Sequence, residues 1–344
     1  MREALETVRR YPAVREIDVG LGDVAFTVRS NERDVAAHLE RYFSRWDERR
    51  ASARHFTVSA LQGDAGIDTS EFVPVARSGG RAPKEAFRNV PGGRIVHKVR
   101  TGLVFFVETE EVTVVGDVLH NLNQVINLIA NLYAQEYLDR GYVMVHASAA
   151  SANRGVAFVA GSGGGKSTLA LALLERGHRF VTNDRLLLRA WGDRPEMIGM
   201  PKLPRVNPGT LLRSPSLRRL VAEPSRYAHL DPGALWRLEE KHDVDVVEIY
   251  GRPVQPRGIL SEVYVLSWSR GAGRMSVRPL TSIELGDRLW RELRTCGIFD
   301  LRAEPRLAWR EEVMAVARKI RGFEVTGGVD VDALADRAAM LERA

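Results

Sequence analysis

The chain has 344 residues, which suits two domains or one large domain with appendages, and its hydrophobic content of 44% supports a sizeable core. A single cysteine, Cys296, excludes an intramolecular disulfide, and the absence of an apolar signal core after Met1 completes the pattern of a cytoplasmic protein. The sequence has no stretch of ~20 apolar residues, so no membrane-spanning segment is predicted. The net charge of +6, from 50 basic and 44 acidic residues, fits an acidic or phosphorylated partner but is not by itself the pattern of a nucleic-acid-binding protein.

Residues 1–116 are predicted to form a small α+β unit. Two apolar runs, Ile17–Val19 and Val24–Val28, flank a Gly-Leu-Gly-Asp turn and indicate a hairpin. Asn31 can cap a helix whose apolar residues recur at four-residue steps, and His55–Ala60 alternates like a strand. The rest of the unit is expected to comprise a loop and three strands of a meander, over Gly63–Asn89, Arg94–Val99, Leu103–Glu108 and Val112–Val115.

A second unit is expected over residues 117–280, led by a helix over 117–140. Apolar residues between Val118 and Leu138 recur at helical spacing. Tyr142–Ala147 then reads as a strand, and a turn at residues 153–155 leads into a short apolar run at Val156–Val159, which is typical of a buried strand.

A glycine-dense turn follows this strand, and an apolar helix follows the turn and ends at Gly177. A phosphate-binding P-loop has this order: a strand, a glycine-rich turn, Gly-Lys-Ser and a helix. In a P-loop, backbone amides and the helix N-terminus hold phosphate oxygens. Lys166 is predicted to reach the β- and γ-phosphates of the nucleotide, and the Ser167 hydroxyl to bind Mg²⁺. The predicted nucleotide-binding residues are Gly161, Ser162, Gly163, Gly164, Gly165, Lys166, Ser167 and Thr168.

The alternative is a glycine-rich turn with an incidental lysine. Only six of the 50 basic residues are lysines, so the chain places a compact ammonium group where a P-loop needs one. The first motif position is Ala160 rather than glycine; it lies at the strand end, where an ordinary backbone conformation suffices. The pattern therefore favours nucleotide binding.

The strand Phe180–Thr182 ends in Asn183-Asp184-Arg185. Ligands of open α/β sheets lie outside the carboxyl ends of the strands, so Asn183 and Asp184 are expected at the same edge as the P-loop. Asp184 could there accept a proton from an attacking hydroxyl or hold Mg²⁺; its alternative role is that of a turn residue. His146, at the end of the preceding strand, could equally be a satisfied polar residue.

The segment from Pro201 to Pro232 is rich in proline and basic residues. Lys202 or Arg205 could stabilise transferred phosphoryl charge, with a solvated loop as the equal alternative. Beyond this segment, a helical extension is expected over residues 281–344. The elements expected after Asp184 are strands at Leu186–Ala190, Glu196–Met200, Ile259–Trp268 and Met275–Leu280, short helices at Leu211–Leu220 and Leu235–Glu240, and helices at Ser282–Cys296, Leu307–Ile320 and Val331–Arg343.

These motifs together resemble the bacterial HPr kinase/phosphorylase family. The resemblance rests on Val145-His146-Ala147, on the P-loop, on Arg176-Gly-His-Arg179 and on Asn183-Asp184-Arg185. It covers roughly residues 141–190, and Asn183 replaces the first acid of the family's pair. Glu248-Ile-Tyr-Gly251 keeps the Glu and first Gly of a further signature but has Tyr250 in place of Arg. The chain resembles an HPr-kinase-related protein, close to the group called HprK-related kinase B.

The resemblance implies an α/β P-loop fold of the HPr-kinase, PEP-carboxykinase-like type, and an ATP- and Mg²⁺-dependent phosphotransferase. It implies that Asp184 accepts the proton, that Lys166 and His146 act on the phosphate side, and that Ser167, Asp184 and Glu248 are candidate metal ligands. The expected acceptor is a serine of a protein or peptide, recruited through an acidic surface by the segment 201–226. The family's tendency to oligomerise extends to this chain as an expectation of a homo-oligomer, whereas the departures from its motifs argue against the reverse, phosphorylase reaction.

Two alternatives remain open. The first is a small-molecule kinase that uses the same site, which a buried acceptor pocket under residues 201–232 would favour. The second is a nucleotide-gated interaction module that binds ATP without transferring phosphate, which Asn183 and the incomplete signature at Glu248 make credible.

Overall fold

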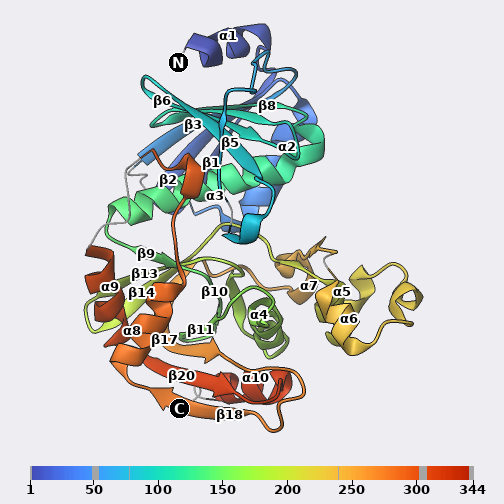
Figure 1. The fold of residues 1–344 in the computed structure, drawn as a ribbon, viewed down its shortest axis with the longest axis vertical. Helices are drawn as coiled ribbons and strands as arrows, with labels where there is room; N and C mark the ends of the chain where they lie inside the picture. Colours follow the sequence, from blue (N-terminus) through green and yellow to red (C-terminus); the bar gives the residue numbers. More distant parts are fainter. Residues whose placement is uncertain (1, 49–53, 77, 239, 302–307, 341–344) are drawn as a thin grey trace. The chain divides into compact units, whose positions relative to one another are not determined.

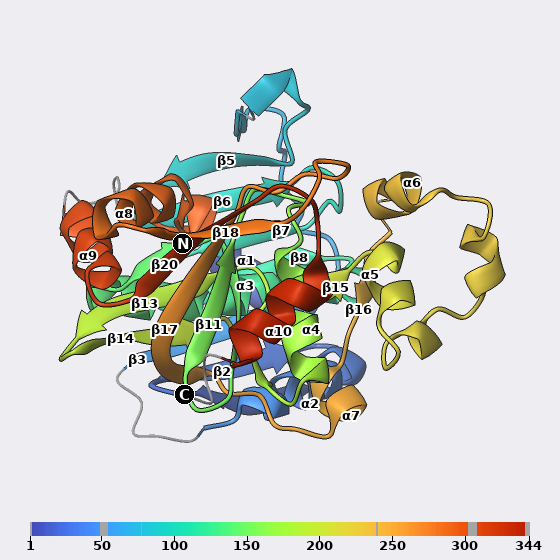
Figure 2. The ribbon, with the colours of Figure 1, turned by 90° about the horizontal axis from the view of Figure 1, so that it is seen from below.

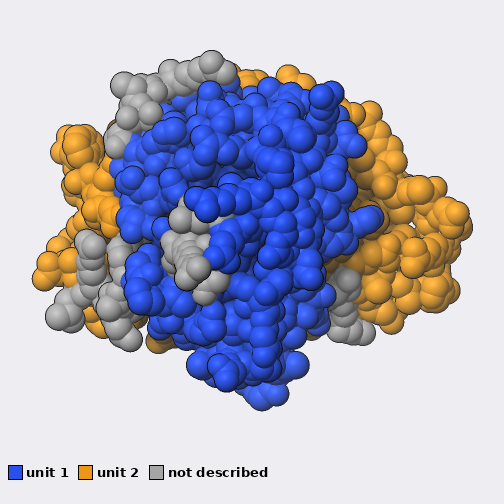
Figure 3. Space-filling view, turned by 90° about the horizontal axis from the view of Figure 1, so that it is seen from above, with its two compact units in different colours: residues 1–136, 296–304 blue, residues 137–295, 305–344 orange. Residues whose placement is uncertain are grey.

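The computed structural model describes residues 2–48, 54–76, 78–238, 240–301 and 308–340. The chain forms two compact units, shown in Figure 3: unit 1 comprises Met1–Glu136 and Cys296–Glu304, and unit 2 comprises Tyr137–Thr295 and Pro305–Ala344. The expected boundary at residue 116 therefore falls too early, because most of helix α3 (Leu122–Asp139) is counted with unit 1. The expected extension 281–344 is not a separate part, since it contributes to both units.

Unit 1 is built on a mixed sheet, which in the described residues has the order β1-β2-β3-β8-β7-β6-β5-β4. β2, β3 and β8 are parallel to one another, and the remaining neighbours pair antiparallel. The strands are β1 (Arg15–Leu21), β2 (Val24–Ser30), β3 (Arg54–Gln62), β4 (Val73–Pro74), β5 (Glu85–Val90), β6 (Gly93–Lys98), β7 (Val104–Val107) and β8 (Glu111–Gly116), and the helices are α1 (Arg2–Arg10), α2 (Arg33–Phe43) and α3. β4 and β5 lie where a loop was expected, and α1 was not anticipated.

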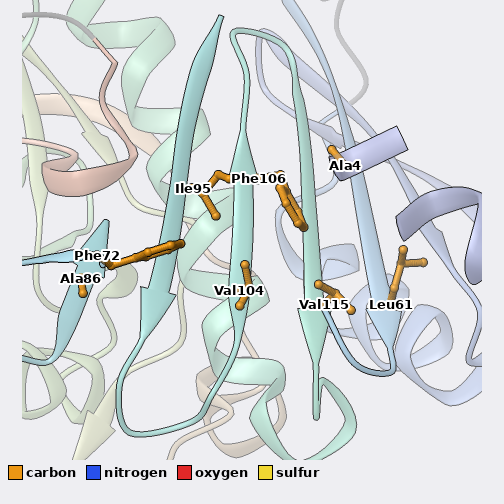
Figure 4. Close-up of a cluster of buried hydrophobic side chains, with 8 residues drawn as sticks. All are labelled: Ala4, Leu61, Phe72, Ala86, Ile95, Val104, Phe106 and Val115. Carbon is orange, nitrogen blue, oxygen red and sulfur yellow. The ribbon is translucent and has the colours of Figure 1, made fainter. Parts of the chain in front are cut away.

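One core of unit 1 gathers on a face of this sheet (Figure 4). Alternate residues of a strand point to the same face, and Val104 and Phe106 of β7 accordingly meet Ile95 of β6 and Ala4 of α1 in one buried cluster. Phe105 points the other way, and its ring contacts that of Phe299, with centroids 5.3 Å apart. Phe299 thus adds to the packing of unit 1.

Unit 2 is built on a second mixed sheet centred on a long strand, β17 (Arg257–Leu266). β17 pairs in parallel with β11 on one edge; on the other edge its first residues pair with β14 and its later residues with β20. The strands are β9 (Val143–Val145), β10 (Ala147–Ser151), β11 (Gly155–Val159), β12 (Arg179–Thr182), β13 (Leu186–Trp191), β14 (Arg194–Gly199), β17, β18 (Ser276–Leu280), β19 (Leu293–Arg294) and β20 (Arg321–Thr326), with β15 (Arg205–Val206) and β16 (His242–Asp243) as a separate pair.

Helices cover this sheet, and α4 packs against β10, β11 and α10 (Figures 1 and 2). The helices of unit 2 are α4 (Lys166–Glu175), α5 (Pro208–Arg213), α6 (Pro232–Arg237), α7 (Val246–Tyr250), α8 (Ser282–Arg291), α9 (Ala308–Ala317) and α10 (Val331–Met340). In the described parts of both units, no helix has the length and apolar character that crossing a membrane requires.

Some elements of unit 2 differ from expectation. The strand expected over Tyr142–Ala147 is divided at His146 into β9 and β10, which belong to different halves of the sheet. The C-terminal part contributes the strand β20, which pairs with β17, in addition to the expected helices.

Candidate functional site

The glycine-rich turn joins the buried strand β11 to helix α4, so the expected order of strand, turn and helix is present. Gly163 and Gly165 have φ angles of 77° and 94°, in the left-handed region that favours glycine. At Gly164 an added Cβ would lie 2.6 Å from the Cβ of Ala160, which leaves no room for a side chain. Because Gly165 caps α4 without a side chain, the amides of the first helical turn stay open to an anion.

Lys166 is buried at the start of α4, with 6% of its surface exposed. Its Nζ donates to the carbonyl oxygens of Ala160 at 2.7 Å and Gly161 at 3.0 Å. Burial lowers the pKa of Lys166 to about 8, while the negative charges of Asp184 and Glu292 act in the opposite direction. The ammonium group is therefore held inside the turn, within electrostatic reach of both carboxylates.

The two hydroxyl residues after Lys166 have different surroundings. Ser167 is half-buried, so its hydroxyl stays accessible from the turn. Thr168 is buried, and its Oγ1 lies 2.9 Å from Oγ1 of Thr210 on α5. The Thr168 hydroxyl thus fastens α4 to α5, and its part in nucleotide binding would come from its backbone amide.

His146 and Asp184 lie on two neighbouring crossovers between the halves of the sheet. The chain passes from β9 to β10 at His146, and from β12 to β13 through Asn183, Asp184 and Arg185. Because β9 pairs with β13 and β10 pairs with β12, the two crossovers lie next to each other, where these strands end. His146 Nε2 consequently lies 3.3 Å from Asp184 Oδ1. This is the same edge at which β11 ends, since Ala147 of β10 is opposite the last residue of β11.

The pKa of Asp184 is held well below its usual range. Burial alone would raise this pKa, but the hydrogen bond from His146 and the positive charges of Arg185 and Lys202 outweigh that effect. The carboxyl side chain is still 56% exposed, so water and a substrate can reach it. Asp184 is therefore ionised at neutral pH and available as a hydrogen-bond acceptor.

Two further residues belong to this cluster, and no motif in the sequence pointed to either. Glu292 and Arg294 come from β19 and the residue before it, about 110 residues beyond Asp184 in the chain. Glu292 Oε2 lies 3.2 Å from His146 Nδ1, and Arg294 Nη2 lies 3.0 Å from the same nitrogen. Their strand was expected to be part of a helix over Ser282–Cys296, which in fact ends at Arg291.

The structure places the three predicted phosphate or substrate residues as follows. Asn183 follows β12 directly, and its side-chain Oδ1 is buried without a hydrogen-bond partner among the described residues. Burial lowers the pKa of Lys202, whose charge acts on Asp184. Arg205 Nε lies 2.7 Å from Oδ1 of Asp243, its neighbour across the β15–β16 pair, so the predicted cationic clamp is already engaged in an ion pair.

Glu248 lies away from the proposed metal position. It belongs to α7, and the Tyr250 hydroxyl at the end of α7 is 3.3 Å from Oε1 of Glu175. Glu175 is the last residue of α4, whereas Ser167 is near its start; at 1.5 Å per residue the two are about 12 Å apart along the helix axis. The structure thus does not bring Glu248 to the phosphate-binding end of α4.

The oxygen donors at the site suit a magnesium ion that is bound together with the nucleotide, rather than a metal held by protein ligands alone. In the part of the chain that the structure describes, no three or more His, Cys, Asp or Glu side chains are grouped to hold a metal. Mg²⁺ is typically held by one or two carboxylates together with substrate phosphates and water. The Ser167 hydroxyl and the Asp184 carboxylate fit that requirement for an ion that arrives with the nucleotide.

Trp268 is a further residue at the P-loop that the sequence did not single out. It follows the carboxyl end of β17, which runs parallel to β11. Its indole Nε1 donates to the carbonyl oxygen of Gly164 at 3.0 Å, and its ring lies 3.2 Å from where a Cβ of residue 165 would be. Trp268 therefore fixes the orientation of the turn and excludes a larger residue at Gly165.

Comparison with known proteins gives a distant likeness to solved structures. No protein-family model matches the chain, and no curated protein matches it. Among solved structures, that of the Hpr(Ser) kinase/phosphatase from Coxiella burnetii is similar at 15% sequence identity, over 58% of this chain and 93% of that chain, with a TM-score of 0.29.

Proposed function

We propose that the protein is an ATP- and Mg²⁺-dependent kinase that transfers the γ-phosphate to a hydroxyl group. The observation that carries the proposal is the convergence of the P-loop with the pair His146 and Asp184. The charge of Asp184 acts on Lys166, and its carboxylate faces the same sheet edge at which the P-loop strand ends. A phosphate-binding turn and an ionised carboxylate at one edge are what transfer to a hydroxyl requires.

The residues divide the chemistry in a simple way. The amides of the turn and Lys166 would hold the β- and γ-phosphates, and a magnesium ion held by the Ser167 hydroxyl would neutralise phosphate charge. Asp184 accepts the hydrogen bond of the acceptor hydroxyl. As the hydroxyl oxygen bonds to the γ-phosphorus and the bond to the ADP oxygen breaks, the hydroxyl proton passes to Asp184. A carboxylate of low pKa suffices, because phosphoryl transfer depends mainly on positioning and charge stabilisation.

The segment between β15 and β16, residues 207–241, is a candidate docking element for a protein acceptor, and we refer to it as the arm. It stands to one side of α4 in Figures 1 and 2. Its base is tied to α4 at both ends, through Thr210 to Thr168 and through Ser216 Oγ to Oε2 of Glu175 at 2.8 Å. An acceptor bound to the arm would therefore be held close to the phosphates.

The charge of the arm supports an acidic partner. Two of its acids are used internally: Glu240 accepts from the Tyr227 hydroxyl at 2.8 Å, and Asp231 caps α6. Arg218 and Arg219 are exposed side by side. We expect Arg218→Glu with Arg219→Glu to raise the KM for the protein acceptor and leave the KM for ATP unchanged. Arg318→Glu, at an exposed site elsewhere in unit 2, is the matched control.

The test of the kinase is transfer of label from γ-labelled ATP with Mg²⁺, using the purified protein and lysate from its own source. Native protein is compared with Lys166→Ala, Asp184→Asn and Asp193→Asn, the last being the same change at an exposed turn. A labelled protein that disappears with the first two variants and persists with the third supports the proposal. Label found only in small molecules would indicate a small-molecule kinase. ATP binding without transfer to any acceptor would instead indicate the gated interaction module.

A further inference from the structure

Four basic residues gather beside the Asp184 carboxylate in unit 2, and we call them the basic cluster: Arg185, Lys202, Arg205 and Lys241. Hydrogen bonds of the backbone hold the first two close together. The Thr182 hydroxyl donates to the Arg185 carbonyl oxygen at 2.7 Å and accepts from the Met200 amide at 3.4 Å. The Lys202 amide in turn donates to the Met200 carbonyl oxygen at 2.7 Å. The end of β12 thus holds Arg185 and Lys202 close to Asp184.

The other two cations lie at the base of the arm, on the pair of strands β15 and β16. Arg205 is opposite Asp243 in this pair, and its Nε lies 2.7 Å from Oδ1 of Asp243. Lys241 directly precedes β16 and is exposed. Lys202 is close to this pair because it lies just before β15 in the chain. The basic cluster therefore extends from the Asp184 carboxylate to the base of the arm.

Lys202 lies in surroundings that hold more positive than negative charge. It is partly buried, and in the described part of the chain its ammonium group has no ion-pair partner within 4.0 Å. Burial lowers the pKa of Lys202, the charge of Asp184 acts in the opposite direction, and the other three cations of the cluster lower it further. Buried charges in proteins are normally paired. An ammonium group in this position therefore indicates that an anion binds beside it when a ligand is present.

We propose that the basic cluster is an acceptor subsite, which binds an acidic side chain of the protein substrate next to the hydroxyl that is phosphorylated. This inference rests on the proposed function and names the kind of acceptor. Because Asp184 and Lys202 are close enough for each charge to act on the other, the hydroxyl and the acidic group lie within a few residues of each other in the acceptor. Lysine and arginine bind carboxylates through short, charge-assisted hydrogen bonds.

The exposure of the basic cluster favours a side chain on a protein over an enclosed small molecule. The side chain of Asp184 is 56% exposed, that of Arg205 is 36% exposed, and Lys241 is exposed as well. The cluster also continues into the arm, to which the proposed function assigns the docking of an acidic protein. An acceptor bound to the arm would therefore pass beside the cluster on its way to Asp184.

The kinetic experiment compares two N-acetylated, C-amidated pentapeptides, in which one serine is followed by two aspartates or by two asparagines. We expect kcat/KM for the aspartate peptide to be about 10- to 100-fold higher in the native protein, the worth of a hydrogen bond to a charged group. In Lys202→Met this preference should fall to about fivefold or less, the contribution left by the exposed cations. Lys319→Met, at an exposed site elsewhere in unit 2, should keep the full preference.

The ratio between the two peptides is the decisive quantity, because a general loss of catalysis or of packing lowers kcat/KM for both peptides alike. A preference for aspartate that survives in Lys202→Met would overturn the inference. So would a native protein that phosphorylates both peptides equally well, and in that case the kinase itself would stand.

Binding is measured without transfer through the six lysines of the chain, labelled with ¹³C at Cε and assigned by single Lys→Arg changes. The aspartate peptide should move the signals of Lys202 and Lys241, and the asparagine peptide should leave them in place. Moved signals without any transfer would support the subsite and count against the proposed function alone, whereas unmoved signals would refute the subsite. N-acetylaspartate that moves both signals as strongly as the peptide would indicate a small anionic acceptor, and would overturn the assignment to a protein.

Discussion

The buried ammonium group of Lys166 gives the folded protein a defined dependence on pH. The ordinary lysine pKa of 10.5 falls to about 8 at this position, chiefly because of burial. Between these two values the unfolded chain holds a proton that the folded chain has released. The unfolded state then binds more protons, so the free energy of unfolding rises with pH in this window.

We compare the free energy of unfolding of the native protein with that of Lys166→Met. All other titrating groups are the same in the two proteins, so their contributions largely cancel in the difference. For pKa values of 10.5 and about 8, this difference should grow by about 2 kcal/mol between pH 7 and pH 9.5 in favour of the native protein. No reduction for solvent screening is needed, because Lys166 is 6% exposed. Lys241→Met, at an exposed site in the same unit, is the matched control.

Urea unfolding at each pH measures this difference in the free energy of unfolding. Pulse proteolysis detects the unfolded protein, and mass spectrometry follows peptides that contain β11. Because β11 belongs to unit 2, this readout reports the unfolding of that unit. A difference that changes by less than about 0.5 kcal/mol would show that Lys166 is not desolvated. The reasoning about its position inside the turn would then be refuted. As a corollary, ATP binding near pH 8.5 should take up a proton, because phosphate charge favours the ammonium form.

Three other predictions follow from single contacts. Trp268→Phe keeps an aromatic ring but loses the donor to Gly164, and should weaken ATP binding by roughly 3- to 10-fold in isothermal titration, about the worth of one hydrogen bond; unchanged affinity would contradict the role given to the indole. Gly164→Ala should weaken ATP binding further while the circular dichroism spectrum stays native, since its Cβ would meet Ala160 at 2.6 Å. Arg321→Met should lower the free energy of unfolding by about 3 kcal/mol in urea titrations, because it leaves the buried Glu262 carboxylate without its ion-pair partner; a loss below about 1 kcal/mol would argue that water reaches that carboxylate.

The sequence predicted the parts of the site that local patterns encode. The P-loop between β11 and α4 could be predicted because its buried strand, its glycines and its apolar helix all lie within residues 155–175. The strand-end rule predicted Asp184 at the edge where β11 ends, and His146 Nε2 lies 3.3 Å from its Oδ1. What brings them together is a pair of crossovers between sheet halves, and this pairing is set by contacts among four strands rather than by any local stretch.

The parts that the sequence missed depend on distant pairings. Glu292 and Arg294 read as the end of an amphipathic helix, because helical spacing continues past Arg291 where the chain in fact pairs with β9. No strand was predicted between the helices expected at Leu307–Ile320 and Val331–Arg343, although β20 lies there and pairs with β17. The metal role given to Glu248 stays a prediction; the contact that the structure shows for its helix joins Tyr250 to Glu175, at the far end of α4 from Ser167.

The return of residues Cys296–Glu304 to unit 1 has a consequence for how the protein is made. Phe299 packs on Phe105, and the Phe299 carbonyl oxygen accepts from the Gln135 side chain at 2.7 Å, so the first unit takes part of its packing from near the end of the chain. During synthesis at the ribosome, that unit emerges early and yet waits for some 160 further residues before its missing piece arrives. Throughout that interval Phe105 has no Phe299 to cover it. A nascent chain of this design would benefit from a holding chaperone, and a gene truncated before Cys296 would leave both halves of the protein unfinished.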